Sequence, residues 1–118
     1  MYDLIIIGGG PAGTAAGVYA SRKQLNTLFV TADWGGQSIV SPDIQNWVGT
    51  PSISGDQLAK DLETHLRTYA EGYLTINDKA CVTGITKHDH GFTVTLSDDT
   101  TAEAKAILIA TGSKRRQL

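Results

Sequence analysis

Cysteine, net charge and long apolar runs are all scarce in this sequence of 118 residues. Its single cysteine, Cys81, cannot form an internal disulfide or a C-x-x-C redox pair, which agrees with a cytoplasmic protein. Ten basic residues against twelve acidic ones give a net charge of −2, which argues against a nucleic-acid-binding surface. The chain start lacks a basic region, and the apolar run at 4–7 is too short for a signal peptide or a membrane span. We therefore expect a cytoplasmic protein that binds neither nucleic acid nor membrane.

The length and the glycine content indicate one tightly turned domain. A chain of 118 residues has a common domain size and is long enough to bury a core. Thirteen glycines are many for this length, and they fall at expected turns rather than in a repeat. We therefore expect residues 1–118 to form a single domain.

The strongest motif joins a short buried strand to a helix. Residues 4–7 form an apolar, largely β-branched run that ends at glycines, as is typical of a buried parallel strand. Gly8, Gly10 and Gly13 follow with the G-x-G-x-x-G spacing of dinucleotide-binding βαβ units. The first glycine permits a tight turn, the second lets backbone N–H groups approach a pyrophosphate, and the third lets the helix pack on the strand. Pro11 suits the first helical turn. The motif predicts dinucleotide binding, and the alternative is a glycine-rich turn without a ligand.

The next elements complete a βαβ unit and supply a candidate acid. An alanine-rich helix is expected over 14–23 and a second buried strand over 27–31. Asp33 lies 20 residues after Gly13, near the position where an acidic residue binds the adenosine ribose in NAD-type sites. Because the strand ends at Thr31, Asp33 either contacts ribose or is a solvated loop acid.

A long segment of weak periodicity, 32–54, follows the second strand. Segments of this kind inside compact domains are usually functional or disordered, and Trp34 and Trp47 argue against disorder. Such a loop could wrap a flat ligand, with Gly35 and Gly36 permitting close backbone approach. The alternative is that the two tryptophans cover the core.

The second half of the chain predicts a helix and five strands. Ser54 and Gln57 have the spacing of a capping box before a helix with leucines at helical intervals. Strands are expected at 73–76, then at 81–86, 92–96 and 100–105 as an antiparallel meander, and finally at 106–112 beside the first strand. The fold class is therefore α/β, a Rossmann-like parallel sheet with helices and a three-stranded antiparallel meander.

Three further features of the sequence are not assigned a functional role. His88 and His90 flank an expected turn without a third ligand, so no metal site is predicted. The basic residues 114–116 are expected to be a solvated terminus. Cys81 is expected in a strand without a resolving partner, which favours a structural thiol.

Four segments together closely resemble the FAD domain of the thioredoxin reductase family, the low-molecular-weight pyridine nucleotide-disulfide oxidoreductases. They are Ile-Ile-Gly-Gly-Gly-Pro-Ala-Gly at 6–13, Gly-Gly-Gln at 35–37, Asn-Trp at 46–47 and Ile-Ala-Thr-Gly at 109–112. The likeness runs from Tyr2 to about Ser113 and covers only the opening segment of a family member.

The resemblance implies a set of FAD-binding residues and no catalytic residue in this chain. The pyrophosphate would lie at Gly8, Gly9, Gly10, Pro11, Ala12 and Gly13; the ribose and ribityl chain along Asp33, Trp34, Gly35, Gly36, Gln37 and Ser38; the flavin end near Gln37 and Asn46; the adenine at Cys81 and Val82; and Ala110, Thr111 and Gly112 would pack against the cofactor.

In that family FAD passes electrons from NADPH to an active-site disulfide, and relatives without a dithiol reduce other acceptors. Family members continue with an NADPH domain and a closing FAD segment that contains Gly-Asp. The resemblance therefore implies a fragment, or one piece of a split protein, that binds FAD and is inactive alone. NADPH and the acceptor, a redox protein or a small disulfide, would belong to the parent enzyme. The alternative is a stand-alone dinucleotide-binding module, and an unpaired edge strand makes a homodimer a further expectation.

Overall fold

The computed structural model describes residues 1–113, so the predicted basic tail at 114–116 lies outside the described residues. Two α-helices, one 3₁₀ helix and six strands follow each other along the chain. They are β1 (Tyr2–Ile7), α1 (Pro11–Arg22), β2 (Thr27–Val30), the 3₁₀ helix η1 (Gly36–Val40), α2 (Gly55–Arg67), β3 (Leu74–Asn77), β4 (Val82–His88), β5 (Gly91–Leu96) and β6 (Thr101–Ile109).

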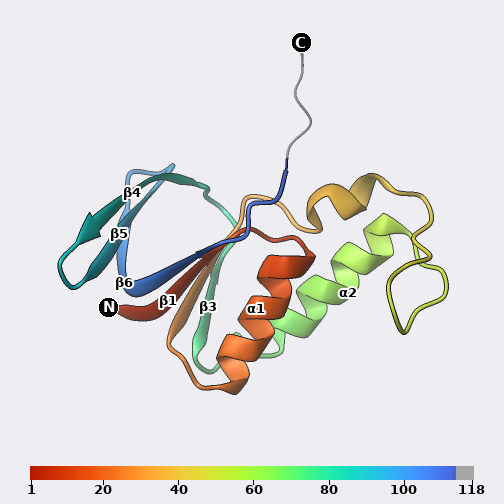
Figure 1. Ribbon diagram of the computed structural model, residues 1–118, viewed down its shortest axis with the longest axis horizontal. Coiled ribbons are helices and arrows are strands. Elements are labelled where there is room, and N and C mark those ends of the chain that lie inside the picture. The colour runs from red at the N-terminus through yellow and green to blue at the C-terminus, as the bar shows by residue number, and fades with distance from the viewer. Residues whose placement is uncertain (114–118) are drawn as a thin grey trace, which may run out of the picture.

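The six strands form one mixed sheet in the order β3-β2-β1-β6-β5-β4. The pairs β3-β2, β2-β1 and β1-β6 are parallel, while β6-β5 and β5-β4 are antiparallel. The predicted α/β class, with a parallel sheet and a meander, is confirmed. Both helices lie on one side of the parallel strands, and the meander extends from the other side (Figure 1).

The two strands predicted at 100–105 and 106–112 are one continuous strand, which corrects the sequence interpretation. The first part of β6, 101–104, pairs with β5, and the part at 104–109 pairs with β1. No glycine, proline or asparagine interrupts the sequence from Thr101 to Ala110, so nothing in the backbone stops the strand where its partner changes. As a result β6 joins the parallel and antiparallel halves of the sheet.

The core lies on both faces of the parallel strands. On the helix face, Ile6 and Phe29 are fully buried against α1 and α2. On the opposite face, Ile5 and Ile7 pack with Val94 and other buried residues of the meander. Because strand side chains alternate, β1 buries its residues on both faces, as expected for a central parallel strand.

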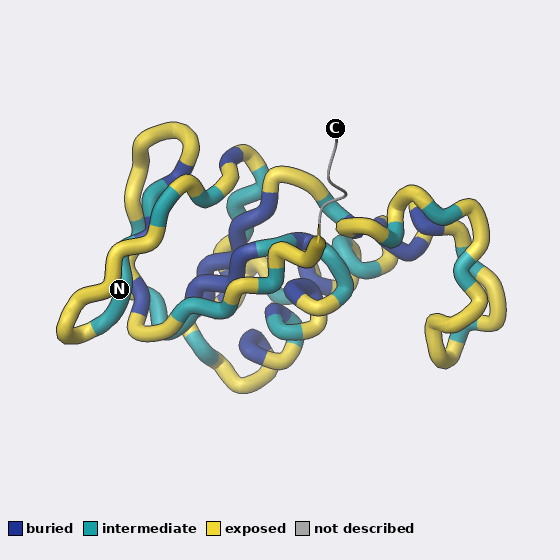
Figure 2. The backbone as a smooth tube through the Cα atoms, turned by 45° about the horizontal axis from the view of Figure 1, so that its top comes forward, coloured by how far each residue is buried: buried dark blue, intermediate teal, exposed yellow. Residues whose placement is uncertain are grey.

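The segment predicted as irregular contains one helical turn and a protruding loop. After η1, the loop at 44–53 is closed by isolated bridges between Ile44 and Ile53 and between Trp47 and Thr50. Figure 2 shows this loop as largely exposed, at the end of the molecule away from the meander. Among residues 1–113, no helix is long and apolar enough to cross a bilayer.

The predicted N-cap of α2 is present, but only half of the capping box forms. The Gln57 backbone N–H donates to Ser54 Oγ at 3.1 Å. The Gln57 side chain does not reach back to Ser54 and instead donates to Asp61 at 2.8 Å. The cap therefore fixes where α2 begins through one hydrogen bond rather than two.

Candidate functional site

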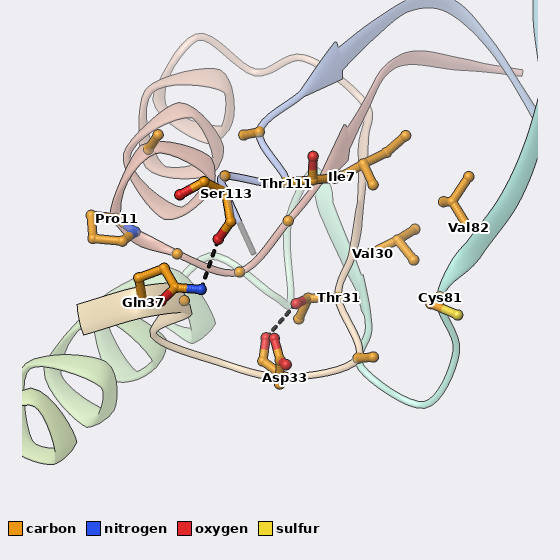
Figure 3. Close-up of a pocket in the computed structure, with 18 of the residues that line it drawn as sticks. Ile7, Pro11, Val30, Thr31, Asp33, Gln37, Cys81, Val82, Thr111 and Ser113 are labelled. Atoms are coloured by element: carbon orange, nitrogen blue, oxygen red, sulfur yellow. Dashed lines mark hydrogen bonds between the residues drawn. The ribbon is translucent and has the colours of Figure 1, made fainter. Parts of the chain in front are cut away.

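A cavity of about 780 Å³ opens at the carboxyl ends of β1, β2 and β6 (Figure 3). Ligands of open parallel sheets bind at this edge, and the volume lies in the range of small-molecule sites. Its lining consists of Ile7, Gly8, Gly9, Gly10, Pro11, Ala12, Val30, Thr31, Ala32, Asp33, Gly36, Gln37, Ser38, Cys81, Val82, Ala110, Thr111, Gly112 and Ser113.

Gly8 and Gly13 are glycines because the protein itself leaves no room for a side chain. Gly8 has a φ of 122°, and a Cβ there would lie 2.2 Å from the Ala110 carbonyl oxygen. A Cβ at Gly13 would lie 1.9 Å from the Gly8 carbonyl oxygen. These two positions set how closely the turn approaches β6 and how closely α1 approaches the turn.

Gly10 is different, because nothing in the protein requires a glycine there. Its φ of −80° and ψ of −171° suit any residue. A Cβ at Gly10 would meet only the Gly36 backbone, with Gly36 Cα at 3.6 Å, an ordinary contact. Gly10 and Gly36 both line the cavity, and their backbones lie close together, because a Cβ on Gly36 would lie 3.3 Å from Gly10 Cα.

The N-terminus of α1 borders the cavity without a neutralising group. Gly10 is the N-cap and provides no side-chain cap, and no acidic residue lies in the first turn. Unpaired N–H groups and the helix dipole therefore present partial positive charge to the cavity. An anionic group such as a pyrophosphate fits this site.

Three hydrogen bonds fix the wall opposite the glycine turn. The Thr31 hydroxyl donates to the Asp33 carbonyl, and the Gly35 N–H donates to the Gly9 carbonyl at 2.9 Å. Gln37 Nε2 donates to the Ser113 carbonyl at 2.7 Å. The segment after β2 is thus tied to the glycine turn, and η1 is tied through Gln37 to the segment after β6, a hydrogen bond that Figure 3 shows.

The chain is similar to known proteins over nearly its whole length. Residues 2–118 match the family model of the pyridine nucleotide-disulphide oxidoreductases. The chain belongs to this family. The resemblance to thioredoxin reductases noted in the sequence is confirmed, because solved members share the fold.

Relatives of this oxidoreductase chain include full-length enzymes. Thioredoxin reductase from Lactococcus lactis is 33% identical with a TM-score of 0.91, and the match covers 100% of this chain and 38% of that chain. Thioredoxin reductase from Streptococcus pyogenes is 35% identical with a TM-score of 0.87, covering 100% of this chain and 37% of that chain. The F component of alkyl hydroperoxide reductase from Staphylococcus epidermidis is 34% identical over 117 residues, 99% of this chain and 22% of the relative. The chain therefore spans well under half the length of these family members.

The structure brings most of the predicted site residues of this family member to one cavity. All of them line it except Gly13, Trp34, Gly35 and Asn46. Asn46 is exposed in the 44–53 loop, and Gly35 is buried where a Cβ would lie 2.6 Å from Ala59 Cβ.

Sequence reasoning missed five lining residues: Ile7, Val30, Thr31, Ala32 and Ser113. The sequence contained a signal for four of these five residues, because they stand at or just beyond the last residue of β1 or β2, near the glycine motif. Assigning the ends of these parallel strands to the site would have included those four.

Cys81 lies at the cavity wall rather than inside a strand. The strand predicted from residue 81 begins one residue later, at Val82, and Cys81 is exposed. Its backbone N–H donates to Ser97 Oγ at 3.1 Å. The expected strand position is therefore corrected: Cys81 is exposed beside the cavity and stands just before β4.

Trp34 is turned away from the cavity into a cluster that we call the Trp34 clamp, made of Phe29, Trp34, Arg67 and Asp78. The rings of Phe29 and Trp34 stack with centroids 5.5 Å apart and planes at 15°. The Arg67 guanidinium carbon lies 5.3 Å from the centroid of the Trp34 ring. Arg67 also donates to Asp78 at 2.6 Å and to Glu63 at 2.8 Å.

The clamp sets the ionisation of Asp78. Partial burial raises the pKa of Asp78, but hydrogen bonds from Arg67 and Trp34 and the charges of Arg67 and Lys79 outweigh it, so the pKa is lowered from its ordinary 3.8. A carboxyl group whose pKa is lower in the folded state stabilises the fold above pH 3.8 and loses that contribution as the pH falls through the folded-state value.

We expect Asp78→Asn to make the free energy of unfolding depend less on pH in the acid range. The wild type should lose more free energy of unfolding between pH 5 and pH 3 than the variant, by no more than about 1 kcal/mol because the pair is partly exposed. Urea unfolding at both pH values measures this. Contributions from the other acids with lowered pKa values, Asp3, Asp43 and Asp98, are common to both proteins and cancel. Parallel acid limbs for the two proteins would contradict the expectation.

Proposed function

We propose that this chain forms the pyrophosphate- and adenosine-binding part of an FAD site in an NAD(P)H-dependent flavoprotein oxidoreductase of thioredoxin reductase type. The observation that carries the proposal is the N-terminus of α1, which has no capping side chain and no acidic residue in its first turn and borders a cavity of about 780 Å³ at the glycine turn. A ligand that carries negative charge near its middle and extends to both sides of this helix end is a dinucleotide.

Each wall of the cavity would perform a separate binding task. The first turn of α1 would hold the pyrophosphate through backbone N–H groups. Asp33, exposed at the end of β2, would accept hydrogen bonds from ribose hydroxyl groups. Cys81 and Val82 would lie against the adenine, and the segment 110–112 would line the other side.

The bound FAD would carry electrons between a pyridine nucleotide and a disulfide or another acceptor. The residues described above bind and orient a cofactor, and we assign none of them a proton-transfer or nucleophilic step. Hydride transfer needs both cofactors in contact, so NADPH and the acceptor protein or small disulfide would meet the flavin in a full-length enzyme. A homodimer of that enzyme is part of the same proposal.

Alkylation of Cys81 tests the proposal through the only thiol in the chain. We expect FAD and ADP to slow its reaction with iodoacetamide, about tenfold when the ligand is present at ten times its Kd, because occupancy of the adenosine end covers the cavity wall. FMN, which lacks adenosine, should protect much less. Intact-mass spectrometry at timed intervals measures the modified fraction.

The same assay separates the outcomes. Protection by FAD and ADP alike, with flavin lost on desalting, would mean that the chain builds the adenosine half of the site and resembles a stand-alone dinucleotide-binding module. If saturating FAD leaves the alkylation rate of Cys81 unchanged, the cofactor does not cover this wall of the cavity, and the proposal is contradicted. Urea-unfolded protein gives the unprotected rate as a reference.

A further inference from the structure

The Trp34 clamp joins four parts of the fold behind one wall of the cavity. Phe29 belongs to β2, Trp34 to the segment between β2 and η1, Arg67 ends α2, and Asp78 directly follows β3. Arg67 is held from two sides by carboxylates at 2.8 and 2.6 Å, so its guanidinium has a fixed place above the indole. The same ring also stacks on Phe29 with centroids 5.5 Å apart.

Trp34 lies in the sequence between two residues that line the cavity. Asp33 precedes it, and Gly36 follows it after Gly35. The Gly35 N–H donates to the Gly9 carbonyl at 2.9 Å, which sets the distance between this wall and the glycine turn. Trp34 is therefore covalently placed between a residue that lines the cavity and the residue that binds the glycine turn.

The segment between the end of β2 at Val30 and the start of η1 at Gly36 has no regular secondary structure, so it is held by individual contacts. The Thr31 N–H donates to the Asn77 carbonyl at 3.0 Å, and the Gly35 N–H donates to the Gly9 carbonyl at 2.9 Å. Gly35 packs against α2, where a Cβ on Gly35 would lie 2.6 Å from Ala59 Cβ. Trp34 is the only large side chain in the sequence 31–36, and its contacts with an aromatic ring and a guanidinium have defined geometry.

We propose that Trp34 and Arg67 are positioning residues of the site: they hold the wall at 33–36 in the geometry that binds the cofactor and do not contact the cofactor themselves. This inference rests on the proposed FAD-binding function. It also replaces the expectation that Trp34 lies along the ribityl chain with a role behind the wall. The ring is large and stacked, so it fixes the backbone of a segment that glycines would otherwise leave free.

The first test uses the free chain and hydrogen exchange by NMR. Trp34→Leu should speed exchange of the Gly35 amide about tenfold, which corresponds to about 1.4 kcal/mol of lost protection. The Gly8 amide, which donates to the Val30 carbonyl at 3.0 Å, serves as an internal reference and should change much less. Trp34→Phe keeps an aromatic ring and should restore slow exchange.

The second test measures Kd for ADP and FAD by calorimetry at a temperature where every variant is folded. Trp34→Leu and Arg67→Met should each bind about tenfold more weakly, and Trp34→Phe and Arg67→Lys should recover most of the affinity. Because both changes break one unit, the double variant should bind little worse than either single variant. Arg67 is partly exposed, so Arg67→Met keeps the test valid if Trp34→Leu fails to fold.

Val94→Ala is the matched control, since it removes part of a fully buried side chain from the meander and lowers stability away from this wall. It should change neither Gly35 exchange relative to Gly8 nor Kd. If Trp34→Leu behaves like Val94→Ala in either measurement, the clamp is ordinary packing and the proposal is overturned. If the wild type binds neither FAD nor ADP, the proposed function fails, and the exchange measurement alone then decides whether the clamp holds the wall.

Discussion

Replacing Gly13 with alanine should strongly destabilise the fold. The new Cβ would lie 1.9 Å from the Gly8 carbonyl oxygen, and both atoms belong to positions that backbone geometry fixes. Either α1 must move away from the sheet or the glycine turn must open, and we expect a loss of at least about 3 kcal/mol. That is a large share of the total for a domain whose free energy of unfolding is in the usual range of about 5–15 kcal/mol. Urea unfolding followed by circular dichroism measures the change.

Gly84→Ala is the control for the Gly13 change. Gly84 lies in β4, and a Cβ there would meet nothing within 4 Å. This variant should stay within about 1 kcal/mol of the wild type. Equal stability of Gly13→Ala and Gly84→Ala would show that α1 does not pack on the turn as closely as described.

Gly10→Asp should abolish nucleotide binding and leave the fold intact. The backbone at Gly10 is extended, as an N-cap requires, and the cavity leaves room for the side chain. An N-cap aspartate stabilises a helix by a few tenths of a kcal/mol relative to glycine, so the melting temperature should not fall. The same carboxylate would occupy the place proposed for the pyrophosphate and repel it. We expect Kd for FAD to rise roughly a hundredfold or more, about 2.7 kcal/mol.

Gly10→Asn separates charge from size in this experiment. Asparagine caps the helix with nearly the same shape but carries no charge, so it should bind more weakly than the wild type and more tightly than the Asp variant. Calorimetry with FAD and ADP, together with thermal unfolding of the free chains, gives both quantities. Unchanged affinity in Gly10→Asp would show that the N-terminus of α1 does not hold the pyrophosphate.

Local patterns explain why much of this fold can be predicted from the sequence. The run at 4–7, the glycine spacing after it and the cap at Ser54 act over a few residues, so their consequences can be deduced directly. The continuity of β6 could not be deduced in this way. Its residues have one partner strand at 101–104 and another at 104–109, and partners far away in the sequence decide where such a strand ends.

Local sequence patterns likewise predict one part of the candidate site and not the other. The glycine turn follows from spacing alone, whereas most other lining residues came from family resemblance. The direction of Trp34 depends on Phe29 and Arg67, which stand on other elements, and no pattern near residue 34 reports it. The strand at Cys81 was placed one residue too early, because local patterns do not fix the first residue of a strand.

The pairing of the first strand with the last also determines when the site can form during synthesis. β1 leaves the ribosome before the other strands described here, but its neighbour β6 and the Ala110 carbonyl against which Gly8 packs are made near the end of these 118 residues. Closing so long a loop costs chain entropy that no earlier contact of β1 with β6 offsets. The glycine motif is therefore translated long before it has a cavity to line. A ribosome that stalls before Ala110 releases a chain with the whole motif and no binding site.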